Sequence, residues 1–301
     1  MSANAHGNFR GKRLVVFGCG YVGSAVARDA LARGVEVTAL TRNAAKAAAL
    51  RADGIEVLVG DLATTAWHAA LGGEVDFALN CVSSGGAGLD GYRRSYVEGM
   101  RSVLEWANSR ARVGTLVYTS STAVYPQNDG AAVDESAAVG GSERAEVLLA
   151  AEQLLRTPGA ADTRWFVLRL AGIYGPGRLH LVNQVRAGEV SGRGEHHLNL
   201  AHRDDIAAAV WACFVAPPEI KNEILNVADD GAARKADVVA WLAARLGKPV
   251  PRFTGVAAEG RAAVTPDRIV SSRKLKTLLD WRPRFPSFRA GYENMLSEEG
   301  K

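Results

Sequence analysis

The sequence is poor in cysteine and contains no long apolar run. Its 301 residues include three cysteines, Cys19, Cys81 and Cys213, which lie far apart and show no C-x-x-C pair and no Cys/His spacing typical of zinc ligands. We therefore expect buried thiols in a reducing compartment, without a structural disulfide or a bound metal. The apolar run at residues 14–17 is too short for a signal-peptide core and far too short to span a bilayer. These absences predict a cytoplasmic protein that has no membrane partner.

The chain also lacks an excess of charge of one sign. Its 36 basic and 32 acidic residues give a net charge of +4, and no basic run is long enough to indicate a nucleic-acid interface. Proline is scarce, at 10 residues, which excludes a proline-rich linker protein. With 48% hydrophobic and 23% charged residues, the composition is typical of a folded globular protein.

Short apolar runs alternate with alanine-rich helical stretches over the first two-thirds of the chain. The runs lie at residues 13–18, 35–41, 55–60, 75–80, 113–120 and 163–170, and the helical stretches at 21–33, 43–52, 89–108 and 142–156. Nearly continuous apolar strands separated by helices indicate a parallel sheet that is covered on both faces. We predict an α/β fold with a Rossmann-type, doubly wound parallel sheet.

The rhythm changes after residues 175–177, which read Gly-Pro-Gly. Helices are expected at 178–193, 235–246, 272–279 and 286–296, with a short strand at 224–227. We interpret residues 1–174 as a dinucleotide-binding domain. Residues 175–301 then form mainly a small substrate-binding lobe, with some segments returning to the Rossmann core.

A glycine-rich turn follows the first strand and opens the first helix. Residues 18–23 read Gly-Cys-Gly-Tyr-Val-Gly and match the pattern G-x-G-x-x-G. In such a turn, Gly18 would permit the tight bend, Gly20 would let the backbone approach a diphosphate, and Gly23 would allow close helix–strand packing. Tyr21 and Val22 lie in the same turn. A glycine turn without a ligand is the alternative, but the strand–turn–helix context favours dinucleotide binding.

The end of the second strand indicates which dinucleotide is bound. NAD-binding proteins usually have an acid here, about 20 residues past the glycines, for the ribose 2′-hydroxyl. This sequence has Thr41 and Arg42 instead. A guanidinium suits a 2′-phosphate, so NADP(H) is favoured and NAD(H) stays possible; Arg42 could also be a solvated charge at a helix start.

Two further segments follow strands of the predicted sheet. Asp61 and Leu62 follow the third strand, where they could edge the adenine, although Asp61 is about as readily explained as a helix cap. Cys81, Val82 and Ser83 leave the fourth strand where a cofactor ribose would lie.

These residues resemble the extended short-chain dehydrogenase/reductases, which form the NAD(P)-dependent epimerase/dehydratase family, and more closely its atypical members. The resemblance covers nearly the whole chain. It rests on ordered motifs, which are VVFGCGYVGSAVA at 15–27, VYTSSTAVYP at 117–126, VLRLAGIYGPGR at 167–178 and NLAHRDDIA at 199–207.

The sequence departs from this family at its catalytic pair. Family members carry Tyr-x-x-x-Lys on the helix after the fifth strand, where the lysine lowers the tyrosine pKa and the tyrosine passes a proton. Here the matching positions are Arg144 and Leu148. Shifting the alignment does not restore the pair, because the chain has no lysine between residues 46 and 221 and no tyrosine between 125 and 174.

Other family positions are mixed. Ser121 matches the catalytic Ser/Thr, although it could equally cap backbone at a strand end. Tyr125 or Arg144 would have to replace the missing acid/base pair, and Tyr125 is as readily explained as a packing residue. Positions that bear on the substrate or on the lobe are Tyr96, which replaces an asparagine; Leu198, which replaces an arginine of nucleotide-sugar enzymes; and His202 and Asp205, which we expect to be structural.

The resemblance implies an NADP(H)-binding oxidoreductase or epimerase/dehydratase that acts on a small polar carbonyl or hydroxyl substrate. The missing Tyr-x-x-x-Lys supports an alternative, a catalytically inactive NADP(H)-binding sensor or regulator. A weaker alternative is an interaction protein whose cofactor site is only structural. By analogy with the family, a homodimer through the helices at 89–108 and 142–156 is possible.

Overall fold

The computed structural model describes residues 9–84, 88–157, 163–256 and 266–299. The chain divides into two compact units, and each is built from three segments. The first unit comprises residues 1–124, 140–169 and 207–225, and the second comprises residues 125–139, 170–206 and 226–301. The units therefore alternate along the chain, and a domain boundary after residue 174 stays a prediction.

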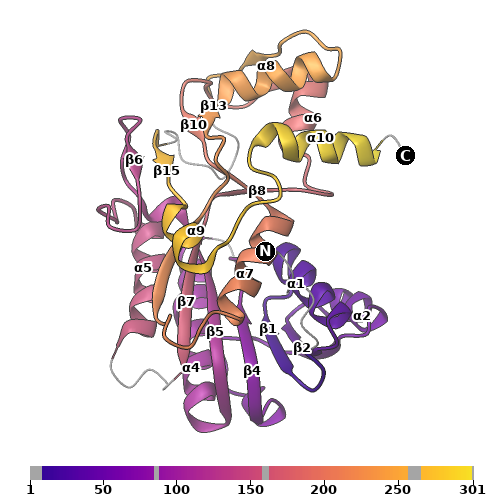
Figure 1. Ribbon diagram of the computed structural model, residues 1–301, viewed down its shortest axis with the longest axis vertical. Coiled ribbons are helices and arrows are strands. Elements are labelled where there is room, and N and C mark those ends of the chain that lie inside the picture. The colour runs from indigo at the N-terminus through magenta and orange to yellow at the C-terminus, as the bar shows by residue number, and fades with distance from the viewer. Residues whose placement is uncertain (1–8, 85–87, 158–162, 257–265, 300–301) are drawn as a thin grey trace. The chain divides into compact units, whose positions relative to one another are not determined.

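A seven-stranded sheet forms the framework of the first unit (Figure 1). Its strands, in spatial order, are β12 (Glu223–Val227), β7 (Arg164–Leu170), β5 (Ala111–Ser121), β4 (Gly73–Asn80), β1 (Arg13–Phe17), β2 (Glu36–Thr41) and β3 (Glu56–Val59). The ladders from β5 to β3 are parallel. The predicted Rossmann-type parallel sheet is confirmed, and its strand order reverses between β1 and β4.

Helices cover both faces of this sheet. Along β1, Leu14 and Val16 point to one face, and Val15 and Phe17 to the other. Helix α1 (Tyr21–Ala32) packs on the first face, because a Cβ atom built at Gly23 would lie 3.2 Å from Cγ1 of Val16. Helix α2 (Ala44–Ala52) connects β2 to β3.

Helices α4 (Gly99–Ser109) and α5 (Glu143–Arg156) cover the opposite face. An aromatic cluster lies beneath them, with ring centroids 5.0 Å apart for Phe17 and Trp67 and 5.3 Å for Phe17 and Trp106. Val147 and Ala151 of α5 are four residues apart, so both face this core, as helical periodicity requires. The side chain of Ser142 caps α5 by accepting a hydrogen bond from the Ala145 N–H.

The predicted helix at 89–108 is one continuous helical stretch with an irregular middle. It begins as α3 (Gly88–Arg93), passes through the π-helical turn η2 (Arg94–Glu98) and continues as α4. Short 3-10 turns elsewhere in this unit are η1 (His68–Ala70) and η3 (Thr122–Val124).

The second unit has its own core, formed by helices and two-stranded ladders. The helices are α6 (His180–Ala187), α8 (Lys235–Arg245), α9 (Arg273–Leu279) and α10 (Phe288–Glu299). The ladders are β8 (Gly172–Tyr174) with β11 (Leu200–His202), β10 (His197–Leu198) with β13 (Ala233–Arg234), β9 (Glu189–Val190) with β14 (Arg252–Phe253), and β6 (Ala132–Val133) with β15 (Ile269–Val270). Buried side chains of α6, α8 and α10 pack into one apolar cluster.

Two expectations about helices were wrong. The helix predicted at 178–193 ends at Ala187, because Gly188 adopts a left-handed conformation (φ 79°) and the chain continues as strand β9. Helix α7 (Arg203–Phe214) was not predicted at all.

The cysteines are three free thiols. Cys19 and Cys213 are buried as expected, whereas Cys81 is half-buried. Within the described ranges, no helix combines the length and apolar character that crossing a membrane requires. The same ranges contain no group of three His, Cys, Asp or Glu side chains that could ligate a metal.

Candidate dinucleotide site

The three glycines of the first turn differ in the space around them. Gly18 has φ +81°, and a Cβ atom there would lie 2.6 Å from Cα of Val82. A Cβ atom at Gly23 would lie 2.7 Å from Sγ of Cys81. At Gly20, by contrast, the nearest atoms would be the Gly18 carbonyl oxygen at 3.7 Å and Nζ of Lys46 at 3.9 Å. Gly18 and Gly23 therefore permit close packing, whereas Gly20 leaves open space in front of the backbone.

The open space at Gly20 faces the beginning of a helix. Gly20 is the N-cap of α1, and the first turn of this helix contains no acidic residue. The first N–H groups of a helix lack partners within the helix and carry a partial positive charge. This arrangement fits the diphosphate of a dinucleotide, because a larger residue than glycine would occupy the space that the phosphates need.

A cavity of about 320 Å³ lies at the carboxyl ends of β1, β2, β3 and β4, all within the first unit. It brings together eight residues that the sequence identified, which are Gly18, Gly20, Thr41, Arg42, Asp61, Leu62, Val82 and Ser83. It also includes Cys19, Leu40, Asn43, Lys46, Gly60, Ala63, Arg94 and Ser95, which were not singled out as site residues.

Two cations stand at the β2 side of the cavity. Arg42 follows β2, and Asn43 caps α2 by accepting a hydrogen bond from the backbone N–H of Lys46 at 2.9 Å. This cap places Lys46 in the first turn of α2, from which its ammonium reaches toward Gly20. Sequence reasoning missed Lys46, although its position three residues after the Asn43 cap was a usable signal. The described residues of the first turn of α2 include no acid, so this corner of the cavity favours an anion.

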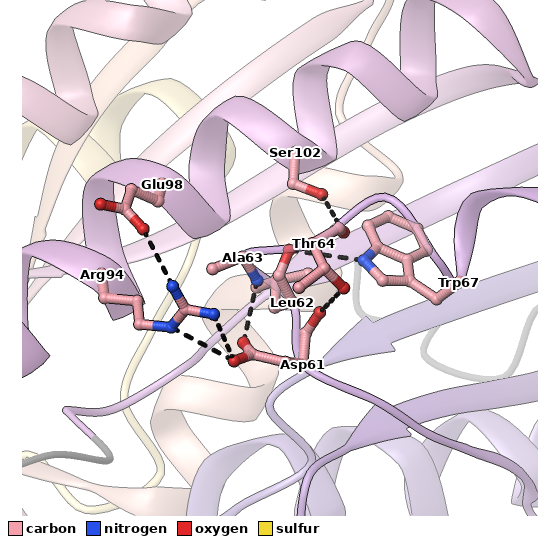
Figure 2. A network of polar contacts seen from close by, with 8 residues as sticks. All are labelled: Asp61, Leu62, Ala63, Thr64, Trp67, Arg94, Glu98 and Ser102. Carbon is pink, nitrogen blue, oxygen red and sulfur yellow. Dashed lines mark hydrogen bonds and ion pairs between the residues drawn. The ribbon is translucent and has the colours of Figure 1, made fainter.

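An ion pair connects the loop after β3 to η2 (Figure 2). The Asp61 carboxylate accepts hydrogen bonds from the Ala63 N–H at 3.0 Å and from the Arg94 guanidinium at 2.9 Å. Burial alone would raise the pKa of Asp61, but these contacts outweigh it, and the pKa lies below its ordinary value. The contact with Ala63 lies in a turn, and no helix begins at Asp61, so the helix cap that the sequence left open was wrong. A contact with adenine stays a prediction.

The same loop is attached to α4 by hydrogen bonds (Figure 2). The Ser102 hydroxyl donates to the Thr64 carbonyl at 2.7 Å, and Nε1 of Trp67 donates to the Leu62 carbonyl at 3.4 Å. The ring nitrogen Nε2 of His68 lies 2.9 Å from the Ser102 hydroxyl. These contacts hold Leu62 against the core and fix this wall of the cavity.

Four predicted cofactor residues do not line the cavity. Gly23 and Val22 are buried in the packing of α1, and Tyr21 is half-buried at the start of this helix. The thiol of Cys81 donates a hydrogen bond to the Gly18 carbonyl at 3.1 Å, and burial raises the pKa of this thiol. These four residues pack around the glycine turn and do not face the cavity.

The three candidate catalytic residues lie in different surroundings. Ser121 is at the end of β5, where its hydroxyl oxygen accepts a hydrogen bond from the Ala123 N–H at 3.1 Å. Arg144 is exposed in the first turn of α5. Tyr125 belongs to the second unit, is 1% exposed, and donates to Oδ1 of Asn226 at 2.8 Å. This contact fits the packing role that the sequence left open for Tyr125.

Helix α5 is held by a buried ion pair one turn beyond Leu148. The Glu152 carboxylate accepts hydrogen bonds from Nη2 of Arg169 at 2.7 Å and from the Ser120 hydroxyl at 2.6 Å. The side chains of Glu152 and Arg169 are 4% and 5% exposed. Leu148 itself is 1% exposed and therefore belongs to the interior.

His202 and Asp205 organise the fold of the second unit, as expected. Asp205 accepts hydrogen bonds from the backbone N–H groups of Arg284 at 2.6 Å and Phe285 at 3.1 Å. His202 is fully buried, and burial lowers its pKa, so it is neutral at pH 7. Both hydrogen bonds of Asp205 come from backbone N–H groups.

The sequence pattern of the NAD dependent epimerase/dehydratase family matches residues 14–228 of this chain. The protein YeeZ of Escherichia coli K12 is 26% identical over 262 residues, which are 84% of this chain and 90% of YeeZ. A functionally unknown conserved protein from Silicibacter pomeroyi is 26% identical with a TM-score of 0.79, and the alignment covers 95% of this chain and 99% of that one.

A UDP-glucuronic acid 4-epimerase from Bacillus cereus, solved with NAD, also has this fold. Its TM-score is 0.77 at 18% identity, and the alignment covers 96% of this chain and all of that one. Since the family pattern spans most of the chain, the protein belongs to the NAD dependent epimerase/dehydratase family.

Proposed function

We propose that this protein binds NADP(H) and acts as an oxidoreductase or epimerase/dehydratase on a small polar carbonyl or hydroxyl compound. The observation that carries the proposal is the pair of cations, Arg42 and Lys46, at the corner of the cavity where an NAD-binding protein would have an acid. Two cations and a helix N-terminus favour the 2′-phosphate that distinguishes NADP from NAD.

The other lining residues support a whole dinucleotide. Gly20 and the first turn of α1 would hold the diphosphate, and Leu62 with Asp61 would edge the adenine. Val82 and Ser83, where β4 ends, would contact the second ribose. A bound NADPH would supply a hydride to the substrate, and this chain's own residues would orient the substrate and manage its proton.

Titration of protein fluorescence with NADPH and NADH tests the proposed cofactor. We expect NADPH to bind at least about tenfold more tightly, because a charge-assisted contact with the 2′-phosphate contributes about 1.5–3 kcal/mol. Arg42→Ala should lower NADPH affinity and leave NADH affinity nearly unchanged, whereas Lys46→Ala should lower the affinity for both cofactors, because the Lys46 ammonium also reaches toward Gly20. Arg112→Ala is the matched control. That side chain is 87% exposed and lies at the amino-terminal end of β5, whereas the cavity lies at the carboxyl ends of the strands. Equal affinities for the two cofactors in the parent would contradict the proposal.

A sensor without redox chemistry is the second candidate function. It is favoured by the interior position of Leu148, which stands where the family has its lysine. An apolar, buried side chain leaves the nicotinamide ribose without an ammonium contact and leaves a neighbouring phenol without its usual activation.

A panel of NADPH-linked carbonyl reductions and NADP-linked alcohol oxidations separates the two candidates. Turnover that falls in Ser121→Ala or Arg144→Ala supports an enzyme with its reacting oxygen near these residues. Tight NADPH binding without turnover on the whole panel supports the sensor.

A homodimer through the helices at 89–108 and 142–156 also stays a proposal, which sedimentation velocity would test.

A further inference from the structure

Two tyrosines lie together in front of the first turn of α5. Tyr92 in α3 and Tyr96 in η2 are four residues apart, and their ring centroids are 4.5 Å apart. The Arg144 guanidinium lies 5.8 Å from the centre of the Tyr92 ring. The backbone N–H of Ser84 lowers the pKa of Tyr96. All four residues belong to the first unit, and both phenols are half-buried.

This phenol pair, Tyr92 and Tyr96, adjoins one end of the cavity along two separate segments. Ser83 lines the cavity, and the backbone N–H of the next residue, Ser84, lowers the pKa of Tyr96. Ser95 also lines the cavity, and Tyr96 follows it in the chain. The π-helical turn that carries Ser95 and Tyr96 is an irregularity that is frequent at functional sites.

The strand order indicates which half of a dinucleotide would reach the phenol pair. A dinucleotide crosses a doubly wound sheet at the point where the strand order reverses, here between β1 and β4. The cations Arg42 and Lys46 mark the β2 side as the adenosine half. The nicotinamide half then lies toward β4 and β5, where Ser84 and the phenol pair are.

We propose that Tyr96 is the catalytic proton donor and acceptor, and that Tyr92 and Arg144 are positioning residues for its hydroxyl. The assignment deepens the proposed function and rests on it. In the reducing direction, a bound NADPH would supply a hydride to the carbonyl carbon, and the C=O π electrons would move to the oxygen. The Tyr96 O–H bond then breaks, an O–H bond forms on the product alcohol, and solvent returns a proton to the phenolate.

The surroundings keep Tyr96 protonated until a charge develops beside it. Burial raises the pKa of Tyr96 to about 12 and also raises that of Tyr92, although Arg144 opposes the shift at Tyr92. At pH 7 both hydroxyls are therefore donors. Once Tyr96 has given up its proton, the Ser84 N–H, which lowers the pKa of Tyr96, can stabilise the phenolate.

Tyrosine labelled with ¹³C at Cζ makes the proposal testable without a known substrate. The chain has only 7 tyrosines, so Tyr→Phe variants can assign each resonance. The nicotinamide ring is positively charged in NADP⁺ and neutral in NADPH. We expect the Tyr96 pKa to be lower by about one unit in the NADP⁺ complex than in the NADPH complex, because a nearby positive charge favours the phenolate. Arg144→Leu should raise the Tyr92 pKa, and Arg144→Lys should partly restore it.

The two possible failures are distinguishable. If fluorescence detects no cofactor binding, the proposed function fails and the assignment falls with it. If both cofactors bind and the Tyr96 pKa is the same in the two complexes, the assignment is wrong while NADP(H) binding stands. Tyr292→Phe in the second unit is the matched control and should change neither the Tyr96 resonance nor cofactor affinity.

Turnover gives a second readout for any carbonyl that the parent reduces, with 9,10-phenanthrenequinone and methylglyoxal as first probes. Tyr96→Phe should lower kcat by about 100-fold or more, the usual contribution of positioned proton transfer, with the KM for NADPH unchanged. An unchanged kcat in Tyr96→Phe would overturn the assignment. If the parent reduces neither probe, the difference in the Tyr96 pKa between the two complexes decides the question.

Discussion

Gly20 is the residue at which the candidate dinucleotide site is most sensitive to a side chain. Its φ of −86° lies outside the left-handed region, and no atom lies within 3.4 Å of a built Cβ atom. A substitution at Gly20 should therefore fold, unlike one at Gly18, where φ is +81° and a Cβ atom would meet the Val82 backbone. This difference separates an effect on the ligand from an effect on the fold.

We expect Gly20→Val to fold and to lose at least about 100-fold in NADPH affinity, because its side chain would fill the space in front of the α1 N-terminus. Fluorescence titration measures the affinity, and circular dichroism checks the fold. Ala45→Val, at an exposed position of α2, adds a comparable side chain outside the cavity and should bind like the parent. A folded Gly20→Val protein with parental affinity would show that this turn is not the phosphate site.

Asp229 predicts a pH dependence of stability in the second unit. It is 6% exposed, and burial raises its pKa to about 7, opposed by the Gly231 N–H. Asp230 and Asp205 also raise this pKa, whereas Lys276 lowers it. Because the folded state holds the proton more tightly than the unfolded state, this group makes stability fall as pH rises from about 4 to 7.

Asp229→Asn should remove this pH dependence. The amide keeps an oxygen for the Gly231 N–H and cannot ionise, so we expect a gain of about 2–4 kcal/mol at pH 8 and little change near pH 4. Thermal unfolding of the parent and the variant at both pH values measures the difference. Asp129→Asn is the control, because that acid of the second unit is exposed and is not among the groups that shift the Asp229 pKa. A gain that is the same at both pH values would contradict the prediction.

At the scale of elements, the buried ion pair between α5 and β7 determines how the helix is held. Glu152 accepts from Arg169 and from Ser120, so one carboxylate joins α5 to two strands, β7 and β5. A buried ion pair contributes less than its geometry suggests, because both charges are desolvated, but removing one partner leaves the other uncompensated.

Glu152→Leu should lower the free energy of unfolding by about 3–5 kcal/mol, because it leaves the Arg169 guanidinium buried without its carboxylate. Urea unfolding measures the loss. The double variant Glu152→Leu, Arg169→Met should recover much of it, since neither charge remains. Glu143→Gln, an exposed position of the same helix, should have little effect. A single variant that is as stable as the parent would show that the pair does not hold α5.

At the scale of the whole molecule, the chain combines the family's fold with a changed set of reactive groups. Leu198, which stands where the nucleotide-sugar enzymes have an arginine, packs against the apolar cluster of the second unit. It therefore offers no cation to a diphosphate. Arg144 and Leu148 replace the proton-transfer pair within the first unit.

We expect UDP-glucose and UDP-glucuronic acid to be poor substrates, with rates lower by on the order of 10²–10⁴ than a full proton relay would permit. Incubation with each sugar and either cofactor, followed by chromatography of the products, measures this. NADPH binding in the same preparation is the positive control for a folded site. Robust turnover of either sugar would contradict the prediction.

The sequence by itself determined the parallel sheet, because strands that are buried on both faces must be apolar along their whole length. The glycine turn at residues 18–23 also marked the start of α1. The sequence also identified cavity residues that directly follow strands, such as Gly20, Arg42 and Ser83. This was possible because the carboxyl ends of parallel strands lie on the same side of the sheet. The absence of Tyr-x-x-x-Lys from the helix after the fifth strand follows from the sequence, because the chain has no lysine between residues 46 and 221 and no tyrosine between 125 and 174.

Only the tertiary structure decided which distant side chains meet. Lys46 reaches toward Gly20 because the Asn43 cap fixes the first turn of α2, and Arg94 reaches Asp61 across 33 residues. The meeting of Tyr92, Tyr96 and Arg144 depends on how η2 packs against α5. Contacts between residues of different elements depend on the packing of those elements, so local spacing can indicate a side chain's place on its own helix but not its partner on another.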